Sequence, residues 1–460
     1  MNNDDQILKS RDDKAPLALS KAGAGDTFRL AEGTDCSWLK KEETVDPAQL
    51  RARIEPWLTA LFQSEHFALL VGSGLSHAVH RMATGKILPG MAATTFADFG
   101  PEISAGAKKS AALAGREDGN IEDQIRVANE LLRGLEIIAP TTTGYDVKAT
   151  ALKADLKTVL GQFAASVLMG ENGLITAKAD GMEKAFTYLV SFLMSFASRT
   201  GTRDRLQIVT TNYDRYIEAG ADVAGLHLID RFVGSLLPVF RSSRLDVDMH
   251  YNPPGIRGEP RYLEGVAKFT KLHGSLDWVY SEKSIRRIAL PFGAESIEPY
   301  LNAPGLVRAE ARELMVYPNS AKDRETAAYP YVELFRDFAA AVCRPNGTLI
   351  SFGYSFGDEH INRVIEDMLT IPSTHLVVIS HSDPLGRIMQ MYDRIGRHAQ
   401  VSLLIGDYLG DFQVLVDNYL PKPAIDRTTL RMAELLKSRW AAGGSGSQDA
   451  GQENKEEIAP

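Results

Sequence analysis

Cysteine is nearly absent from this chain: Cys36 and Cys343 are the only two in 460 residues. Two cysteines are too few for a disulfide framework or a four-cysteine zinc site. The ten histidines show no metal-binding spacing such as HExxH. We therefore expect a cytoplasmic, reducing environment and no metal at the functional site.

Long hydrophobic runs are also missing. The apolar stretch 67–72 is far shorter than the roughly 20 residues that a membrane-spanning helix needs. The N-terminal residues MNNDDQILKSRDDKAP are polar and lack the apolar core of a secretory signal. We expect neither a membrane segment nor a secretion signal.

Positive charge is outnumbered, with 51 lysines and arginines against 59 aspartates and glutamates and a formal net charge of −8. This balance supplies no overall basic field for a phosphate backbone, so we do not expect nucleic acid as a direct partner. At 44% hydrophobic residues, the chain is long and apolar enough to bury a sizeable core.

The composition changes along the chain and divides it into regions. Residues 1–46 mix charged residues with glycine and alanine without clear periodicity, which predicts a flexible N-terminal arm. Residues 47–420 are the expected main domain, followed by a C-terminal helix at 421–440. Residues 441–460 contain a single large apolar residue, an isoleucine, and are predicted to be disordered.

Six short apolar runs in the main domain end in Gly, Ser or Thr or in a polar turn and lead into helical patterns. They are residues 67–72, 207–212, 269–274, 348–354, 375–380 and 401–406. Such runs are typical of parallel strands covered by helices on both faces. Residues from about 105 to 200 instead show helical spacing. The expected class is α/β, a Rossmann-like parallel sheet flanked by helices, with a helix-rich insertion or subdomain.

A glycine-containing turn, VGSGLS at 71–76, follows the first predicted strand and precedes a predicted helix. Ligands bind at such junctions in open parallel sheets. Gly72 and Gly74 let the backbone approach a pyrophosphate, and Ser73 and Ser76 can add hydroxyl contacts. Alone, the string also fits an ordinary strand-to-helix turn.

Polar side chains follow the second predicted strand in VTTNYDRY at 209–216. The Asn212 amide can hold a water molecule or a ribose hydroxyl, with Thr211 and Asp214 as neighbouring ligand-binding candidates. The structural alternative is that Asp214 caps the next helix and Asn212 belongs to a turn.

His273 ends the third predicted strand, in TKLHGSLDW at 270–278. Histidine is the side chain best suited to transfer a proton near neutral pH, which makes His273 a catalytic candidate. A lone histidine is also common as a structural residue.

The most distinctive string is LISFGYSFGDEHIN at 349–362, where a predicted strand ends in a polar turn. Gly353, Tyr354 and Ser355 are the ligand-binding candidates of this turn, and Ser355 can bind a ribose hydroxyl. The acidic residues after the turn favour a helix start, and capping alone explains them equally well.

In this order, the strings resemble the sirtuin-like family, the silent-information-regulator-type NAD-dependent enzymes, over about residues 60–410. GSGLS is similar to the family's NAD-cradling glycine turn, TTNYD to TQNID, LHGS to the catalytic HG pair and GYS to GTS. LLIGDYLGDF resembles the closing glycine-acid turn near adenine. The resemblance implies that Asn212 and His273 are catalytic and that Gly72, Ser73, Gly74, Ser76, Thr211, Asp214, Gly353, Tyr354 and Ser355 bind NAD.

The chain departs from the zinc-bearing sirtuin deacylases. It lacks their four-cysteine module, carries HAVHRMATGKILPG where they have GIPDFR, and has Thr211 in place of a glutamine. Its NYD, KLHGS and GYSFGDEHIN strings are similar to a bacterial sirtuin-like group. Known members of that group are mostly NAD hydrolases of antiphage defence, some acting beside a HerA-type ATPase.

The resemblance therefore implies that NAD is a substrate, hydrolysed to nicotinamide and ADP-ribose. Asn212 would position the water and His273 would handle a proton. We also expect a homo-oligomer, and the resemblance implies a HerA-type ATPase partner for some members. Two alternatives stay open: an NAD-dependent deacylase or ADP-ribosyltransferase, and a non-catalytic sensor of NAD or ADP-ribose.

Overall fold

The computed structural model describes residues 6–23, 25–88, 92–113, 116, 118–199, 203–242, 248–251, 261–281, 284–302, 306 and 330–422. The chain divides into two compact units, Met1–Leu420 and Pro421–Pro460. The C-terminal helix and tail that we predict after residue 420 lie outside the described residues, apart from 421–422.

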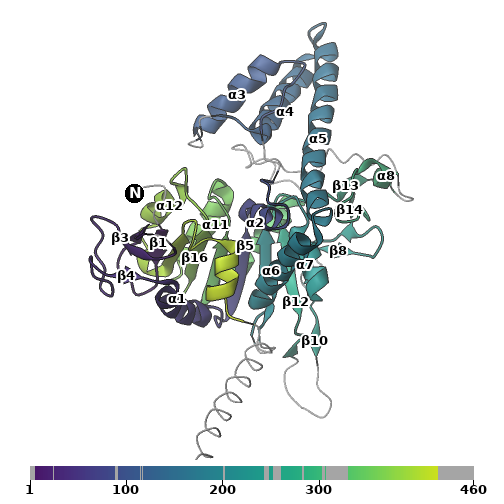
Figure 1. The fold of residues 1–460 in the computed structure, drawn as a ribbon. Helices are drawn as coiled ribbons and strands as arrows, with labels where there is room; N and C mark the ends of the chain where they lie inside the picture. Colours follow the sequence, from purple (N-terminus) through teal and green to yellow (C-terminus); the bar gives the residue numbers. More distant parts are fainter. Residues whose placement is uncertain are drawn as a thin grey trace, which may run out of the picture. The chain divides into compact units, whose positions relative to one another are not determined.

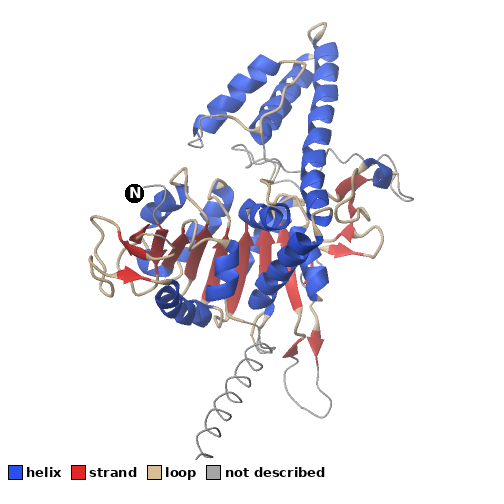
Figure 2. Ribbon diagram, viewed as in Figure 1, coloured by secondary structure: helices blue, strands red, loops and turns tan. Residues whose placement is uncertain are grey.

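The first unit is built on an 11-stranded sheet with helices on both faces (Figures 1 and 2). All six predicted strands are present: β5 (His66–Val71), β6 (Gln207–Thr210), β12 (Val266–Lys271), β15 (Gly347–Phe352), β16 (His375–Ser380) and β17 (Val401–Ile405). They are parallel neighbours in the order β12-β6-β5-β15-β16-β17. Counted along the chain this is 3-2-1-4-5-6, the Rossmann order, and the predicted fold class is confirmed.

The continuous hydrophobicity of these strands reflects burial on both faces of the sheet. Leu69, which pairs in register with residues of β6 and β15, packs into the core on one face. The next residue, Leu70, packs into the core on the opposite face. Both side chains are fully buried, as expected for parallel strands between two helical layers.

Residues 6–45 do not form the predicted flexible arm. They contribute β1 (Gln6–Lys9), β2 (Leu17–Lys21), β3 (Phe28–Leu30) and β4 (Thr44–Val45), which continue the sheet beyond β17. All these pairings are antiparallel, and Leu8, Leu19 and Phe28 are fully buried. The prediction was wrong because each strand is so short that its apolar residues form no detectable pattern between polar turns.

The helix-rich stretch contains α3 (Gly100–Leu113), α4 (Ile121–Ile138), α5 (Tyr145–Ile175) and α6 (Ala179–Ala197). Helices α3 and α4 pack together, and α4 packs on the long α5 (Figure 1). A capping box fixes the start of α4, because Asn120 and Asp123 each accept a hydrogen bond from the other's backbone N–H.

The remaining elements surround this framework. They include α1 (Pro47–Leu61), α2 (Ser73–Thr84), α7 (Tyr216–Ala224), β7 (His227–Ile229), α10 (Tyr331–Val342), α11 (Glu359–Leu369) and α12 (Arg387–Ile395). Short antiparallel sheets join β8 (Phe232–Val233), β9 (Val239–Phe240), β13 (Trp278–Ser281) and β14 (Ser284–Arg287), and β10 (His250–Tyr251) with β11 (Arg261–Tyr262). In the described part of the chain, no helix combines the length and apolarity that a bilayer crossing requires.

We expect the sheet to lose stability in mild acid through His375. Burial, reinforced by the charges of Lys9 and Arg11, lowers the pKa of His375 from 6.5 to about 4. Between these values the unfolded chain binds a proton that the folded chain refuses, so the free energy of unfolding falls as pH falls, by up to about 3 kcal/mol. Urea unfolding of His375→Gln should show a weaker pH dependence than the parent, and an identical slope would contradict this assignment.

Candidate functional site

A cavity of about 380 Å³ lies at the carboxyl ends of β5, β6, β12 and β15. A second cavity of about 1090 Å³ shares six lining residues with it: Ser73, His77, Gly353, Tyr354, Ser355 and Arg387. The strand order reverses between β5 and β15, and Rossmann sheets bind their ligands at that position. The two cavities thus lie where the fold favours an elongated ligand.

Two glycine turns meet between these cavities. The N–H of Gly72 donates to Phe352 O and the N–H of Gly74 donates to Gly353 O, both at 3.0 Å. A Cβ at Gly74 would lie 2.6 Å from the Gly353 Cα, and Gly353 itself has a φ of +62°. Glycine is therefore required at both turns by their close backbone packing, as well as by any approach of a ligand.

The Asn212 side chain is held in one orientation at the end of β6. Its Nδ2 donates to Gly72 O and to the Ser76 hydroxyl, both at 3.0 Å. Ser76 in turn donates to the Asp214 carboxylate at 2.7 Å. Both amide hydrogens are thereby used within the protein, which leaves the Asn212 carbonyl oxygen as the group available to a ligand in the cavity that Asn212 lines.

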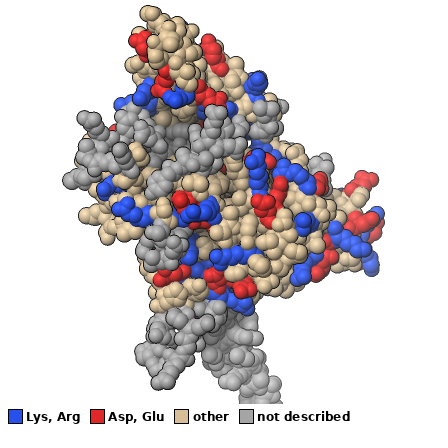
Figure 3. Space-filling model, turned by 180° about the vertical axis from the view of Figure 1, so that it is seen from behind, with Lys and Arg blue, Asp and Glu red and all other residues tan. Residues whose placement is uncertain are grey.

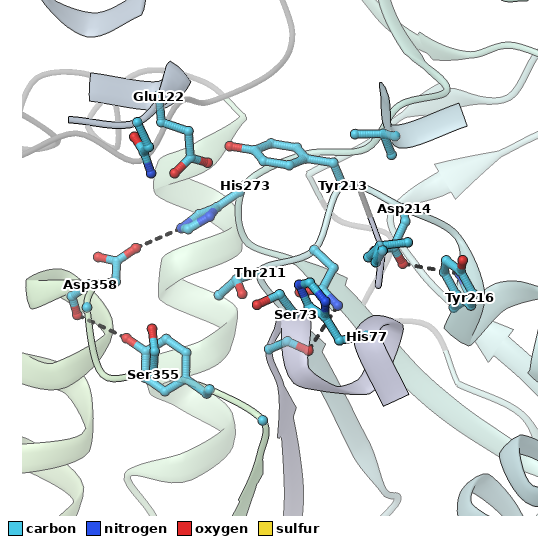
Figure 4. A pocket seen from close by; sticks show the side chains of 18 of the residues that line it. Ser73, His77, Glu122, Thr211, Tyr213, Asp214, Tyr216, His273, Ser355 and Asp358 are labelled. Atoms are coloured by element: carbon cyan, nitrogen blue, oxygen red, sulfur yellow. Dashed lines mark hydrogen bonds and ion pairs between the residues drawn. The ribbon is translucent and has the colours of Figure 1, made fainter. Parts of the chain in front are cut away.

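His273, which lines the same cavity, contacts a carboxylate. Its Nε2 lies 2.8 Å from the Asp358 carboxylate, and both side chains are buried (Figure 4). Asp358 is itself fixed, because it caps α11 by accepting from the His360 N–H at 3.2 Å. The carboxylate therefore orients the imidazole, the arrangement that general acid–base catalysis by histidine uses.

The other predicted site residues are distributed over both cavities. Ser73 and Ser355 line both, Thr211 and Asp214 line the smaller one, and Gly74 lines the larger one. Tyr354 lines both cavities, and its hydroxyl donates to Asp358 O and to Asn362 Oδ1, each at 3.2 Å. Ser76 is buried behind the wall, where it connects Asn212 to Asp214. The structure thus brings every sequence-predicted site residue to one region.

Buried charges support the loop that carries Asn212. Arg215 pairs with Glu171 of α5, and Lys271 donates to Glu218 at 2.9 Å and to the Asp214 carbonyl. Burial raises the pKa of the Asp214 carboxyl, although Lys271 and the Ser76 hydroxyl both favour its charged form. Because buried ion pairs are costly to break, these contacts hold the loop rigidly against the sheet.

Several cavity-lining residues were not identified from sequence: His77, Arg116, Asn120, Glu122, Tyr213, Asp358 and Arg387. Asp358 was interpreted as a helix cap, which it is, but its other oxygen contacts His273. Arg116, Asn120 and Glu122 come from the helical insertion, and no motif signalled that this part of the chain would reach the site. Burial lowers the pKa of His77, which favours its neutral form.

Charges of both signs are interspersed on the face of the molecule shown in Figure 3, and no broad basic area is visible there. This distribution agrees with the formal net charge of −8. A mixed surface gives little attraction to a phosphate backbone. The charged side chains that matter for the candidate site are therefore the ones that line its two cavities, not those on this surface.

Replacing Asp358 with Asn should slow turnover roughly 10- to 100-fold, if His273 transfers a proton. The amide preserves the size and the helix cap but replaces the carboxylate oxygen that contacts His273 Nε2 and orients the imidazole. An unchanged rate in a folded variant would remove Asp358 from the mechanism.

Comparison with known families gives a match over part of the chain. A profile of the family described as SIR2-like domain matches residues 206–394. The segment contains Asn212, His273 and Ser355, whereas the glycine turn at 72–74 and the helical insertion lie outside it. None of the curated proteins compared with the chain matches it. The profile match supports the resemblance to the sirtuin-like family and indicates an NAD-related activity.

Proposed function

We propose that this protein is an NAD glycohydrolase that cleaves the nicotinamide–ribose bond and releases nicotinamide and ADP-ribose. One observation carries the proposal: a fixed amide, Asn212, and an oriented histidine, His273, line the same cavity at the switch point of a Rossmann sheet. NAD is the substrate that the SIR2-like match favours. No metal is required, because cationic nicotinamide is already a good leaving group.

The two cavities, which share six lining residues, suit the two halves of a dinucleotide. We assign the nicotinamide ribose to the smaller cavity, which contains Asn212 and His273, and the adenosine half to the larger one. The pyrophosphate then lies at the shared boundary, near the glycine turns and the Arg387 guanidinium. Backbone turns without Cβ atoms and an arginine are groups that recognise phosphate.

Asn212 and His273 have different roles in the proposed reaction. The C1′–N bond breaks as nicotinamide departs with the bonding electron pair, leaving positive charge on the ribose. The Asn212 carbonyl oxygen accepts a hydrogen bond from the attacking water, and His273, oriented by Asp358, accepts a proton from a ribose hydroxyl or from that water. Both groups are preorganised, so little reorganisation precedes the reaction.

The decisive experiment incubates the purified protein with NAD, alone and with a HerA-type ATPase, and follows nicotinamide and ADP-ribose by chromatography. Equal release of both products supports hydrolysis. Nicotinamide release that depends on an acylated or acceptor protein would favour a deacylase or ADP-ribosyltransferase. Tight NAD binding without turnover under every condition would favour a sensor.

We propose depletion of NAD in bacterial antiphage defence as the biological role, carried out by a homo-oligomer and with a HerA-type ATPase as a candidate partner. The supporting observation is the resemblance of GYSFGDEHIN and its companion strings to that bacterial group. Cellular NAD should fall during infection in cells that carry the protein, and should not fall with an Asn212→Ala variant.

A further inference from the structure

Glu122 is an acidic side chain that the proposed chemistry has not yet used. It lies in the first turn of α4, is only 9% exposed, and lines the smaller cavity. Figure 4 shows its carboxylate directed into the cavity at the end where His273 and the Tyr213 hydroxyl lie. A carboxylate is seldom buried without a chemical or structural reason, because desolvation of its charge is costly.

The position of Glu122 is fixed by the helix that carries it. The capping box of Asn120 and Asp123 sets the start of α4, and Arg116 pairs with Asp123 at 2.6 Å. Ile125, one turn further on, is fully buried in the core. The N-terminal turn of a helix also favours an ionised carboxylate. Glu122 is therefore held in a fixed position on the wall of the cavity that His273 also lines.

We propose that Glu122 is a catalytic residue that acts as the general base toward the attacking water. This inference rests on the proposed NAD glycohydrolase function. The water oxygen forms a bond to the ribose C1′, the C1′–N bond breaks with its electron pair going to nicotinamide, and one water proton passes to the Glu122 carboxylate. The proton is later released to solvent, so that NAD and water give nicotinamide, ADP-ribose and H⁺.

This assignment separates the tasks of the three side chains. Asn212 orients the water through its carbonyl oxygen, and Glu122 removes the water's proton. His273, paired with Asp358, accepts the proton of a ribose hydroxyl as positive charge develops and returns it to the same oxygen once the new C1′–O bond has formed. This assignment of Glu122 also gives the helical insertion a role in the reaction. The insertion lies outside the segment that matches the SIR2-like profile, yet it supplies a cavity wall. Water is thereby selected as the acceptor by a part of the chain that the family match does not include.

The test compares two substitutions on the same helix. Glu122→Gln keeps the shape of the side chain, and should lower the rate of nicotinamide release on the order of 100-fold or more with NAD affinity within about tenfold of the parent. Glu136→Gln is the matched control, because Glu136 is exposed on α4 and pairs only with the exposed Arg133 among the described contacts. It should retain the parental rate and melting temperature.

A second variant distinguishes a base from a structural residue. Glu122→Ala removes the carboxylate, and azide is a nucleophile that needs no deprotonation. Added azide should therefore raise nicotinamide release by this variant at least about tenfold, and the ribose product should be the azide adduct. Azide should not accelerate the Asn212→Ala variant to the same extent, because the base is still present there.

The possible results distinguish a failure of the Glu122 assignment from a failure of the glycohydrolase proposal. A folded Glu122→Gln variant with parental turnover, or a folded Glu122→Ala variant that azide does not accelerate, overturns the role of Glu122 and leaves the glycohydrolase proposal standing. A parent protein that releases no nicotinamide, with or without the ATPase partner, overturns the glycohydrolase proposal and with it the assignment of Glu122. Melting temperature and NAD binding establish that each variant is folded.

Discussion

Replacing His273 with Ala should lower the rate of nicotinamide release by a factor on the order of 100 to 10,000. The imidazole lies at the end of β12, and its Nε2 is 2.8 Å from a buried carboxylate. The measurement is single-turnover release of nicotinamide at saturating NAD, which separates chemistry from binding.

The same substitution leaves Asp358 buried beside a void, so stability must be measured with activity. We expect a loss on the order of 1 to 3 kcal/mol in the free energy of unfolding, because the buried Asp358 carboxylate loses its contact with the imidazole. His227→Ala is the matched control: His227 is exposed on the edge strand β7 and should be replaceable without effect. Parental turnover by a folded His273→Ala variant would remove His273 from the mechanism.

The six central strands were predictable because their side chains are buried on both faces. Continuous apolar runs such as 375–380 can be recognised in the sequence, and the polar turns on either side mark where each run begins and ends. The N-terminal strands carry no such signal. β4 has two residues and β3 has three, and their stability depends on pairing with a sheet whose other strands come from distant sequence. Long-range pairing of this kind cannot be read from local periodicity.

The candidate site was predictable where a residue follows a strand, and not elsewhere. Asn212 and His273 end adjacent parallel strands, so their approach follows from the topology alone. Glu122 reaches the cavity only because the insertion packs against the rest of the unit, and a single acidic residue in a helix carries no motif. Asp358 was ambiguous because one carboxylate serves both the helix cap and the imidazole.

Replacing Asn212 with Ala should abolish nearly all turnover while NAD still binds within roughly tenfold of the parent, a difference of about 1.4 kcal/mol. The substitution removes the carbonyl oxygen proposed to hold the attacking water and keeps the β-carbon at the end of β6. The expected pattern is therefore a large change in kcat with a small change in Kd. NAD affinity, melting temperature and nicotinamide release should be measured on one preparation.

Ser76→Ala provides the comparison that separates orientation from stability. It leaves Asn212 in place but removes the hydroxyl that accepts from its Nδ2 and donates to Asp214. The amide then keeps its contact with Gly72 O, so we expect turnover to fall only about tenfold. The free energy of unfolding should fall by an amount similar to or larger than the free energy that corresponds to this tenfold change, because the Asp214 carboxylate loses the Ser76 donor.

If Asn212 instead only stabilised the turn, Asn212→Ala would lower the melting temperature and leave activity per folded molecule nearly unchanged. A stable Asn212→Ala variant that cleaves NAD at the parental rate would contradict the proposed role.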